Sequence, residues 1–347
     1  MTPAELSRTV AHVVRGAVGE GALGAVGDVV PEAVKVERPR PGGAGDYASG
    51  IALKLASAAG LPPRQVAEVL RQRIAGRPGI ASVEISGPGF LNITLDRDAQ
   101  YDLVRHILES TSGAGAAGAA GAVGVTSGRA PYGHGDALRG ETHEFVEGVD
   151  ERGRVVVEVV VGLLRAQGAV ARVVPGGSGR ELAVVPCPTP RLAELVGVDA
   201  ARWAMLRAAR HDRPRTDVEE LLAQRESNSL FRVRYAYSRS RALTRNALEL
   251  GFRSEAGPVP EGGALLGLLG DHPTVLEGAA RHRAADRLAR HLEAVADELL
   301  RHQHAVLPLG DEKPSAAHRF RLALAEAAGT VLAGGLSLLG IDAPEFL

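Results

Sequence analysis

The stretch that decides the fold of the C-terminal half is SNSLFRVRYAYSRSRALTRNA, residues 227–247. Its apolar side chains return every three or four residues, and this spacing predicts one long amphipathic helix over 227–251. The polar face of this helix carries two neighbouring basic stripes. The first stripe is Arg234, Ser238, Arg241 and Arg245, at i, i+4, i+7 and i+11, and the second is Arg232, Tyr235 and Arg239.

The sequence around this helix has a local excess of positive charge. Between residues 202 and 253 there are 12 arginines and six acidic residues, a local charge of about +6, although the whole chain has a formal charge of −1. A basic helix face with a tyrosine among its arginines suits an RNA backbone together with one stacked base. A solvated helix face gives the same pattern, so spacing alone leaves both interpretations open.

Helical periodicity continues through most of the chain after Asp199, and Pro258, Pro260 and Pro308 mark two of the connections. This pattern predicts an all-α bundle over residues 198–347. The predicted helices are 199–210, 216–225, 227–251, 262–269, 273–279, 281–304 and 315–339.

The first 112 residues mix helix and strand patterns and predict a compact α+β domain. Ile80 to Ile85 and Phe90 to Leu95 alternate as two strands around the turn SGPG. The other predicted elements are helices 4–26, 46–59, 63–75 and 98–108 and a strand over 32–38.

Two further segments separate these halves. Residues 113–130 are rich in Gly and Ala and predict a flexible linker. Residues 131–197 predict a small α/β layer. Within it, VVVEVVVGLLRAQG has the pattern of a buried strand running into a helix, and AVARVV and ELAVVP are further strand candidates.

Composition narrows the class of protein. With 45% apolar residues the chain is typical of a globular protein, and its single cysteine, Cys187, excludes an internal disulfide and predicts no metal site. The N-terminus lacks the pattern of a signal peptide and no apolar run is long enough to span a bilayer, so we expect a cytoplasmic protein without membrane contact. Only Lys35, Lys54 and Lys313 are lysines. Arginine supplies the remaining strong cations, and its planar fork suits phosphate.

The predicted hairpin presents two side chains suited to an unpaired base. Phe90 offers an aromatic face for stacking, and the amide of Asn92 can hydrogen-bond a base edge. On spacing alone this signal is weak, because a Phe at the start of a strand is far more often part of the core than a platform for a base, and both residues also fit as structural parts of the hairpin.

Several stretches resemble the arginyl-tRNA synthetases. GDYASGIALKLA (45–56) and IASVEISGPGFLNITL (80–95) resemble the N-terminal domain of the bacterial-type enzymes. GVDAARWAM (197–205), residues 227–247 and LAEAAGTVLAGGLSLLGIDAPEFL (324–347) resemble their DALR-type anticodon-binding bundle. The resemblance implies tRNA as the partner.

The same resemblance implies roles for particular residues. Phe90 and Asn92 would contact the D-loop corner of tRNA. The anticodon arm would be contacted by Arg232, Arg234, Tyr235, Arg239, Arg241 and Arg245. Where the family has Gln, His and Ala, this chain has Arg234, Tyr237 and Ser238. These differences leave the identity of the tRNA open, with tRNA-Arg as one candidate.

The region that carries the chemistry of the family is short in this chain. The resemblance implies a class I domain in which a His-x-Gly-His turn at a helix start and a Lys-Met-Ser-Lys-Ser loop hold the phosphates of ATP. No lysine lies between Lys54 and Lys313. HEFVEG is similar to the strand before the first signature, and this alignment puts Glu147 and Asp150 at the positions of the two histidines. The segment PYGHG (131–135) offers one histidine as an alternative.

We therefore expect a tRNA-binding paralogue of arginyl-tRNA synthetase. Its expected fold is an α+β N-terminal domain (1–112), a small α/β remnant of the catalytic domain (131–197) and an all-α, DALR-like C-terminal bundle (198–347). We assign no catalytic residue, no metal and no cofactor, and expect no DNA partner. Two alternatives stay open: a ligase with a divergent or partner-supplied active site, for which ATP and arginine would be ligands, and a regulatory module that binds a protein partner.

Overall fold

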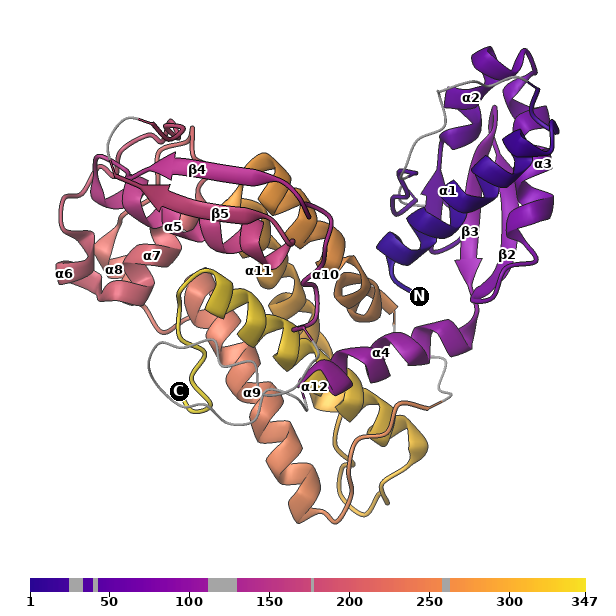
Figure 1. The fold of residues 1–347 in the computed structure, drawn as a ribbon. Helices are drawn as coiled ribbons and strands as arrows, with labels where there is room; N and C mark the ends of the chain where they lie inside the picture. The colour runs from indigo at the N-terminus through magenta and orange to yellow at the C-terminus, as the bar shows by residue number, and fades with distance from the viewer. Residues whose placement is uncertain (25–33, 40–42, 112–129, 176–177, 258–262) are drawn as a thin grey trace. The chain divides into compact units, whose positions relative to one another are not determined.

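A computed structural model describes residues 1–24, 34–39, 43–111, 130–175, 178–257 and 263–347 (Figure 1). Contacts between residues divide the chain into two compact units, Met1–Leu103 and Val104–Leu347. Each unit buries apolar side chains of its own. The predicted linker lies outside the described residues except for its last position.

The first unit is an α+β domain, as predicted. Its antiparallel sheet has the order β1-β3-β2, and the hairpin β2–β3 pairs Glu84 with Asn92 and Ser86 with Phe90. Helices α1 and α3 pack together in this unit, and α3 also packs on β2. The elements are α1 (Pro3–Gly19), β1 (Tyr47–Ser49), α2 (Ile51–Ala59), α3 (Pro63–Ile74), β2 (Ile80–Ser86), β3 (Phe90–Leu95) and α4 (Arg97–Thr111), whose last residues belong to the second unit.

Two predictions in the first unit need correction. The predicted helix 46–59 was wrong at its start, because Tyr47 to Ser49 form strand β1 and the helix begins only at Ile51. A carboxylate oxygen of Asp46 accepts a hydrogen bond from the amide of Leu95 at 2.8 Å, so this residue ties β1 to the hairpin instead of capping a helix. The strand predicted over 32–38 is reduced, in its described part, to a single bridge between Glu37 and Ala48.

The second unit begins with a β-α-β arrangement. Strands β4 (Thr142–Val146) and β5 (Val170–Val174) are parallel neighbours, and α5 (Glu151–Ala166) connects them. The prediction of a strand at the start of VVVEVVV was wrong because the whole run lies in α5. Its valines are buried on several sides of the helix, so the continuous apolar run marks a buried helix and not a strand. ELAVVP forms no strand; only Arg180, just before it, bridges to Phe145.

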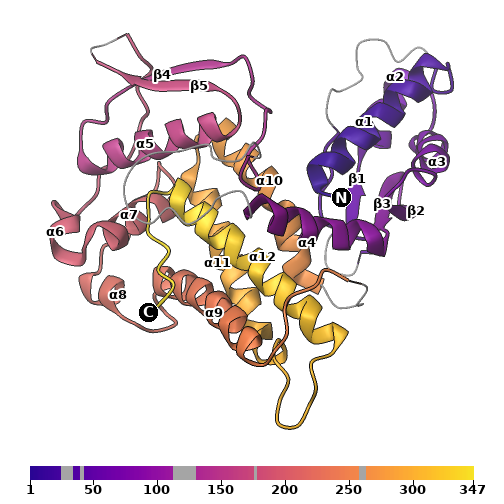
Figure 2. The ribbon, with the colours of Figure 1, turned by 60° about the horizontal axis from the view of Figure 1, so that its bottom comes forward.

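The remainder of the second unit is a helical bundle (Figure 2). Helices α9, α11 and α12 pack side by side, and α10 packs on α11 and α12. The two helices predicted at 262–269 and 273–279 are one helix, α10, which contains Pro273. The elements are α6 (Leu192–Val196), α7 (Val198–Arg207), α8 (Val218–Leu222), α9 (Ser229–Glu249), α10 (Gly263–His282), α11 (Ala285–His302), the 3-10 turn η2 (Gln303–Ala305) and α12 (Ala316–Leu338). The predicted fold class is confirmed.

A buried arginine holds the β-α-β part against the bundle. Arg152, in the first turn of α5, is fully buried. Its guanidinium donates hydrogen bonds to five backbone carbonyl oxygens, those of Val185, Met205, Ala208, Ala209 and Asp212, at distances from 2.6 to 3.1 Å. Three of these carbonyls lie at or just after the C-terminal end of α7, where a helix leaves its last oxygens without partners. Burial lowers the pKa of Arg152, but arginine stays charged in proteins.

Candidate nucleic-acid interface

The β2–β3 hairpin separates its two candidate residues. Phe90 is 42% exposed at the start of β3. Asn92 is buried, and its side-chain amide donates a hydrogen bond to the hydroxyl of Ser86 across the hairpin at 2.9 Å. The Phe90 ring is therefore available to a ligand, whereas the amide of Asn92 holds the hairpin together.

This difference predicts opposite effects of two substitutions. Phe90→Ala should leave the thermal midpoint within about 2 °C and weaken RNA binding, because an exposed ring contributes little to the core. Asn92→Ala should cost about 1–2 kcal/mol of stability, because it removes a buried hydrogen bond. Thermal unfolding and RNA titration of both variants check this. A destabilised Phe90→Ala protein with unchanged RNA binding would contradict the role of the ring.

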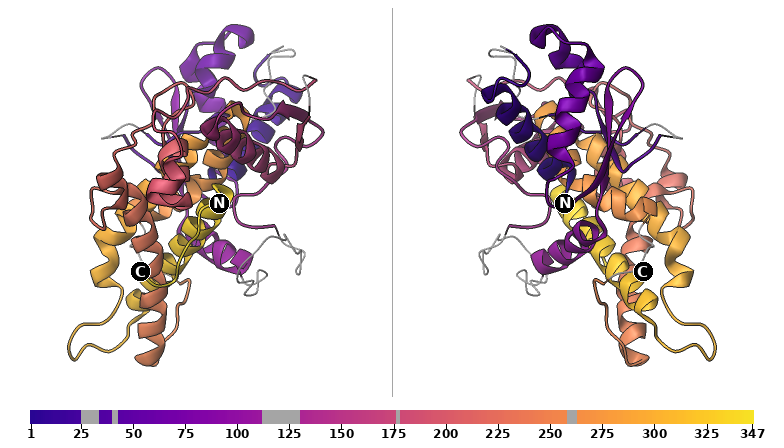
Figure 3. Two further views of the ribbon diagram at one scale, coloured as in Figure 1. Left: turned by 90° about the vertical axis from the view of Figure 1, so that its left-hand side faces the viewer. Right: turned by 90° about the vertical axis from the view of Figure 1, so that its right-hand side faces the viewer.

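The first stripe of α9 is covered by the end of the chain. We define the C-terminal segment as residues 339–347; it follows α12 and is drawn beside α9 in all three ribbon figures (Figures 1–3). Arg234 donates to the carbonyl of Asp342 at 3.0 Å and pairs with Asp199 of α7. Further along the stripe, Ser238 donates to the carbonyl of Glu345, Arg241 pairs with the carboxylate of Glu345, and the guanidinium of Arg245 lies 4.4 Å from the centre of the Phe346 ring.

The second stripe of α9 faces α11 and η2. Arg232 pairs with Asp297 and donates to the carbonyl of Glu226, and Arg239 donates to the side chain of Gln303 at 2.7 Å. Tyr235 remains 40% exposed, and its ring stacks on Phe231 with the centroids 5.9 Å apart and the planes inclined by 11°. This aromatic pair offers a surface on which a base can stack.

The sequence interpretation missed the partner of the first stripe. The four residues of the first stripe do lie on one face of α9, because each of them contacts the C-terminal segment. Arg234 also pairs with Asp199. The acidic and aromatic residues near the C-terminus, Asp342, Glu345 and Phe346, were the available signal. They are complementary in charge and chemistry to the stripe, but they lie about 100 residues away in the sequence.

The β4–α5 connection occupies the place where parallel α/β folds bind nucleotides, at the helix N-terminus beyond a strand end. Here the α5 N-terminus is capped by the protein itself. A carboxylate oxygen of Asp150 accepts a hydrogen bond from the amide of Gly153 at 2.9 Å, and Glu151 adds a second acid to the first turn. Gly148 packs so closely on Gly153 that a Cβ on Gly148 would clash with the Gly153 backbone. A phosphate here would meet two carboxylates and a tightly packed backbone, so these residues do not fit ATP.

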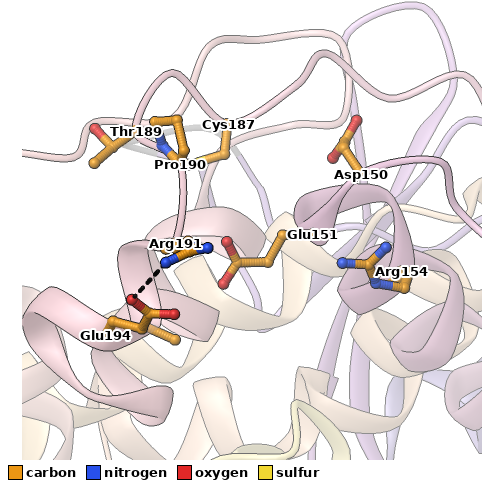
Figure 4. A pocket seen from close by; sticks show the side chains of 9 residues that line it. Asp150, Glu151, Arg154, Cys187, Thr189, Pro190, Arg191 and Glu194 are labelled. Carbon is orange, nitrogen blue, oxygen red and sulfur yellow. Dashed lines mark ion pairs between the residues drawn. The ribbon is translucent and has the colours of Figure 1, made fainter.

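A pocket of about 540 Å³ opens beside this helix start (Figure 4). In the view of Figure 4 the carboxylate of Glu151 lies between the guanidinium groups of Arg154 and Arg191, and Arg191 pairs with Glu194 at 3.6 Å. Acids and bases are thus mixed around the pocket. This mixture lacks the concentrated positive charge that a triphosphate requires.

The alternative histidine lies at the opposite end of α5. The amide of Gly135, next to His134, donates to the carbonyl of Ala166, the last residue of the helix. A helix of 16 residues is about 24 Å long. His134 therefore cannot serve a nucleotide at the α5 N-terminus.

A buried group of aromatic side chains lies near His134. His272 of α10 lies between Tyr132 and His291, with ring centroids 5.8 and 5.3 Å away. The pKa of His272 is lowered well below its ordinary value by burial, with smaller contributions from His291 and His134. His272 is therefore neutral in the folded protein near neutral pH.

The neutral His272 predicts acid sensitivity. Below about pH 6.5 the unfolded chain takes up a proton at this residue while the folded chain does not. The free energy of unfolding should then fall by up to about 1.4 kcal/mol per pH unit until the lowered folded-state pKa is reached. His272→Gln should flatten the decline of the thermal midpoint between pH 6.5 and 5, whereas the exposed His211→Gln should not. Parallel declines in both variants would contradict the assignment.

Two classes of site find no support in the described ranges. Within them, no three or more His, Cys, Asp or Glu side chains are grouped so as to hold a metal ion. None of the helices placed by the structure is long and apolar enough to cross a membrane.

Comparison with known proteins gives matches at both ends of the chain. Residues 4–95 match the model of the arginyl tRNA synthetase N terminal domain, and residues 233–347 match that of the DALR anticodon binding domain. The arginine–tRNA ligases of Renibacterium salmoninarum and Frankia alni are 26% and 27% identical to the chain, over 99% of the chain and 100% of each ligase. The alignment with the Renibacterium protein runs over 547 positions, so about 200 of them have no counterpart among the 347 residues of this chain.

Solved structures show the same fold. The arginyl-tRNA synthetases of Thermus thermophilus and Plasmodium falciparum superpose with TM-scores of 0.70 and 0.71, at 13% and 8% identity, covering all of this chain and all of each neighbour. The chain is therefore built on an aminoacyl-tRNA synthetase scaffold. It is related to the arginyl-tRNA synthetases: it carries their N-terminal and DALR domains and much less of the region between them.

Proposed function

We propose that this protein binds tRNA and does not activate an amino acid on its own. The observation that carries the proposal is the α9 face, where the exposed Tyr235 stacks on Phe231 among five arginines of one helix. A stacking surface beside several cations suits an RNA loop, whose bases are unstacked and whose backbone is anionic. The match to an anticodon-binding domain over the same helix supports this use.

In this proposal the parts of the chain have separate roles. Residues 1–112 would contact the tRNA elbow through Phe90, and residues 198–347 would contact the anticodon arm through α9. Residues 131–197 would be a structural remnant, because Asp150 already caps the helix N-terminus at which a phosphate would bind.

The experiment is a titration of the full chain with purified total tRNA at about 50 and about 200 mM salt, followed by sequencing of the bound species. With three phosphate contacts the affinity should fall about 10- to 100-fold between the two salt concentrations. Enrichment of one group of tRNAs over a random-RNA control supports the proposal and identifies the partner. Binding no stronger than to the control would reject it and favour a protein partner for the same surface.

The catalytic part of the proposal has its own test. Pyrophosphate exchange with arginine and ATP should stay at the background level of a protein-free control, both with and without tRNA. Exchange above that background would favour the alternative, a ligase with a divergent active site.

A further inference from the structure

The C-terminal segment has a firmly held base. The carbonyl of Leu339 accepts a hydrogen bond from Arg202 at 3.1 Å, and Ile341 is buried. Gly340 has φ of +67°, and a Cβ there would clash with the guanidinium of Arg202. Glycine suits this backbone angle, which other residues rarely adopt, and any side chain here would have to displace the guanidinium of Arg202.

The tip of the same segment, residues 345–347, is held by contacts at the surface, among them the hydrogen bond from Ser238 to the carbonyl of Glu345 at 3.0 Å. Arg241 and Glu345 form an ion pair at 3.1 Å with side chains 44% and 47% exposed. Phe346 is 71% exposed, and its ring lies under the guanidinium of Arg245. Exposed ion pairs and exposed cation–π contacts each shift an equilibrium by about fivefold or less. The tip can therefore leave α9 while the base stays in place.

The groups at the tip have the chemistry of an RNA strand. Glu345 places an anion on Arg241, as a phosphate would, and Phe346 places an aromatic ring on Arg245, as a base would. Arg234, nearer the base, is engaged by the carbonyl of Asp342 and by Asp199. The cations of the first stripe thus already have acidic, carbonyl or aromatic partners within the protein.

We propose that the tip of the C-terminal segment is an internal competitor for the α9 face and that RNA binds this face by displacing it. The inference rests on the proposed tRNA binding and adds its regulation. If the tip covers the stripe in most molecules, the apparent affinity for tRNA is reduced by the fraction in which the stripe is open. Any change that weakens the tip contacts should then strengthen RNA binding.

The test compares two variants of the segment that alter its charge. The double variant Glu345→Gln, Phe346→Ala removes the ion pair to Arg241 and the ring contact to Arg245, and it keeps the hydrogen bond from Ser238 to the carbonyl of Glu345. Asp342→Asn removes one negative charge from the same segment, but Arg234 contacts only the backbone carbonyl of Asp342, so it is the matched control. We expect the double variant to bind purified tRNA about 5- to 10-fold more tightly at about 100 mM salt, and the control to differ from the wild type by less than about twofold.

The other outcomes separate the two proposals. If the wild-type protein binds tRNA and the double variant binds equally well or more weakly, the internal competitor is rejected while tRNA binding stands. If neither the wild type nor the double variant binds tRNA above the random-RNA control, both proposals are rejected.

A fluorescent variant gives an independent readout. In Phe346→Trp the introduced indole should stack on Arg245, and tRNA should shift its emission toward that of a solvent-exposed indole. Trp203 is buried, so its emission supplies a constant background, which the wild-type protein measures under the same conditions. RNA binding without a shift in the emission of the introduced indole would overturn the displacement model.

Discussion

Replacement of Arg152 by methionine is expected to lower the thermal midpoint of the second unit by about 10 °C. The side chain is fully buried and satisfies five backbone carbonyls at once. Methionine fills a similar space but donates no hydrogen bond, and each buried acceptor left without a donor costs about 1–3 kcal/mol unless water reaches it. Water will reach some of these acceptors, so we expect the free energy of unfolding to fall by about 3–5 kcal/mol. In a unit of this size the thermal midpoint falls by about 2–4 °C for each kcal/mol of stability lost.

The matched control is Arg154→Met, two residues along the same helix. Arg154 is exposed beside the α5 N-terminus, so its replacement should change the midpoint by less than about 2 °C. Arg152→Lys should fall between the two, because an ammonium has three donors where the guanidinium has five. Scanning calorimetry of the three variants measures the effect. Equal midpoints for Arg152→Met and Arg154→Met would show that the five hydrogen bonds do not hold the unit together.

Local patterns predicted the long elements of this fold well. Helix α9 and the β2–β3 hairpin follow from periodicity and turn residues, because both are stabilised by neighbours close in sequence. The valine run of α5 could not be assigned in the same way. A continuous apolar stretch fits either a buried strand or a buried helix, and only the Asp150 cap and the packing around the helix decide between them.

The features that sequence patterns did not predict depend on contacts between residues that are far apart in the chain. Strand β1 forms because residues 47–49 pair with β3, more than 40 positions away. Arg152 looks like any other arginine of the chain until the carbonyls of Val185, Met205 and Asp212 are brought around it. The burial of Asn92 likewise depends on its pairing across the hairpin. Its residue type suggested a hydrogen bond to a base, but in the fold its amide donates to the hydroxyl of Ser86.

Neutralising the first stripe should have the largest effect on RNA binding. We expect the triple variant Arg234→Gln, Arg241→Gln, Arg245→Gln to reduce tRNA affinity at about 100 mM salt by on the order of 100-fold or more, because each arginine that contacts a phosphate releases about one counterion. The slope of log affinity against log salt should become shallower by about one unit for each of these arginines that contacts a phosphate. Among the described residues, Arg241 and Arg245 pair with the exposed tip of the C-terminal segment, whereas Arg234 also pairs with Asp199, so a thermal melt must accompany the titration.

A control triple separates a local contact from the effect of total charge. Arg139, Arg172 and Arg191 are exposed arginines of the same unit, and each pairs with one nearby acid away from α9. Their replacement by glutamine changes the net charge by the same three units, but should alter tRNA affinity by only a few-fold and leave the salt slope nearly unchanged. Equal losses in the two triples would mean that tRNA senses the overall charge of the protein and that the α9 face is not its site. A loss confined to the first stripe would assign the phosphate contacts to Arg234, Arg241 and Arg245, the same side chains that the C-terminal segment covers.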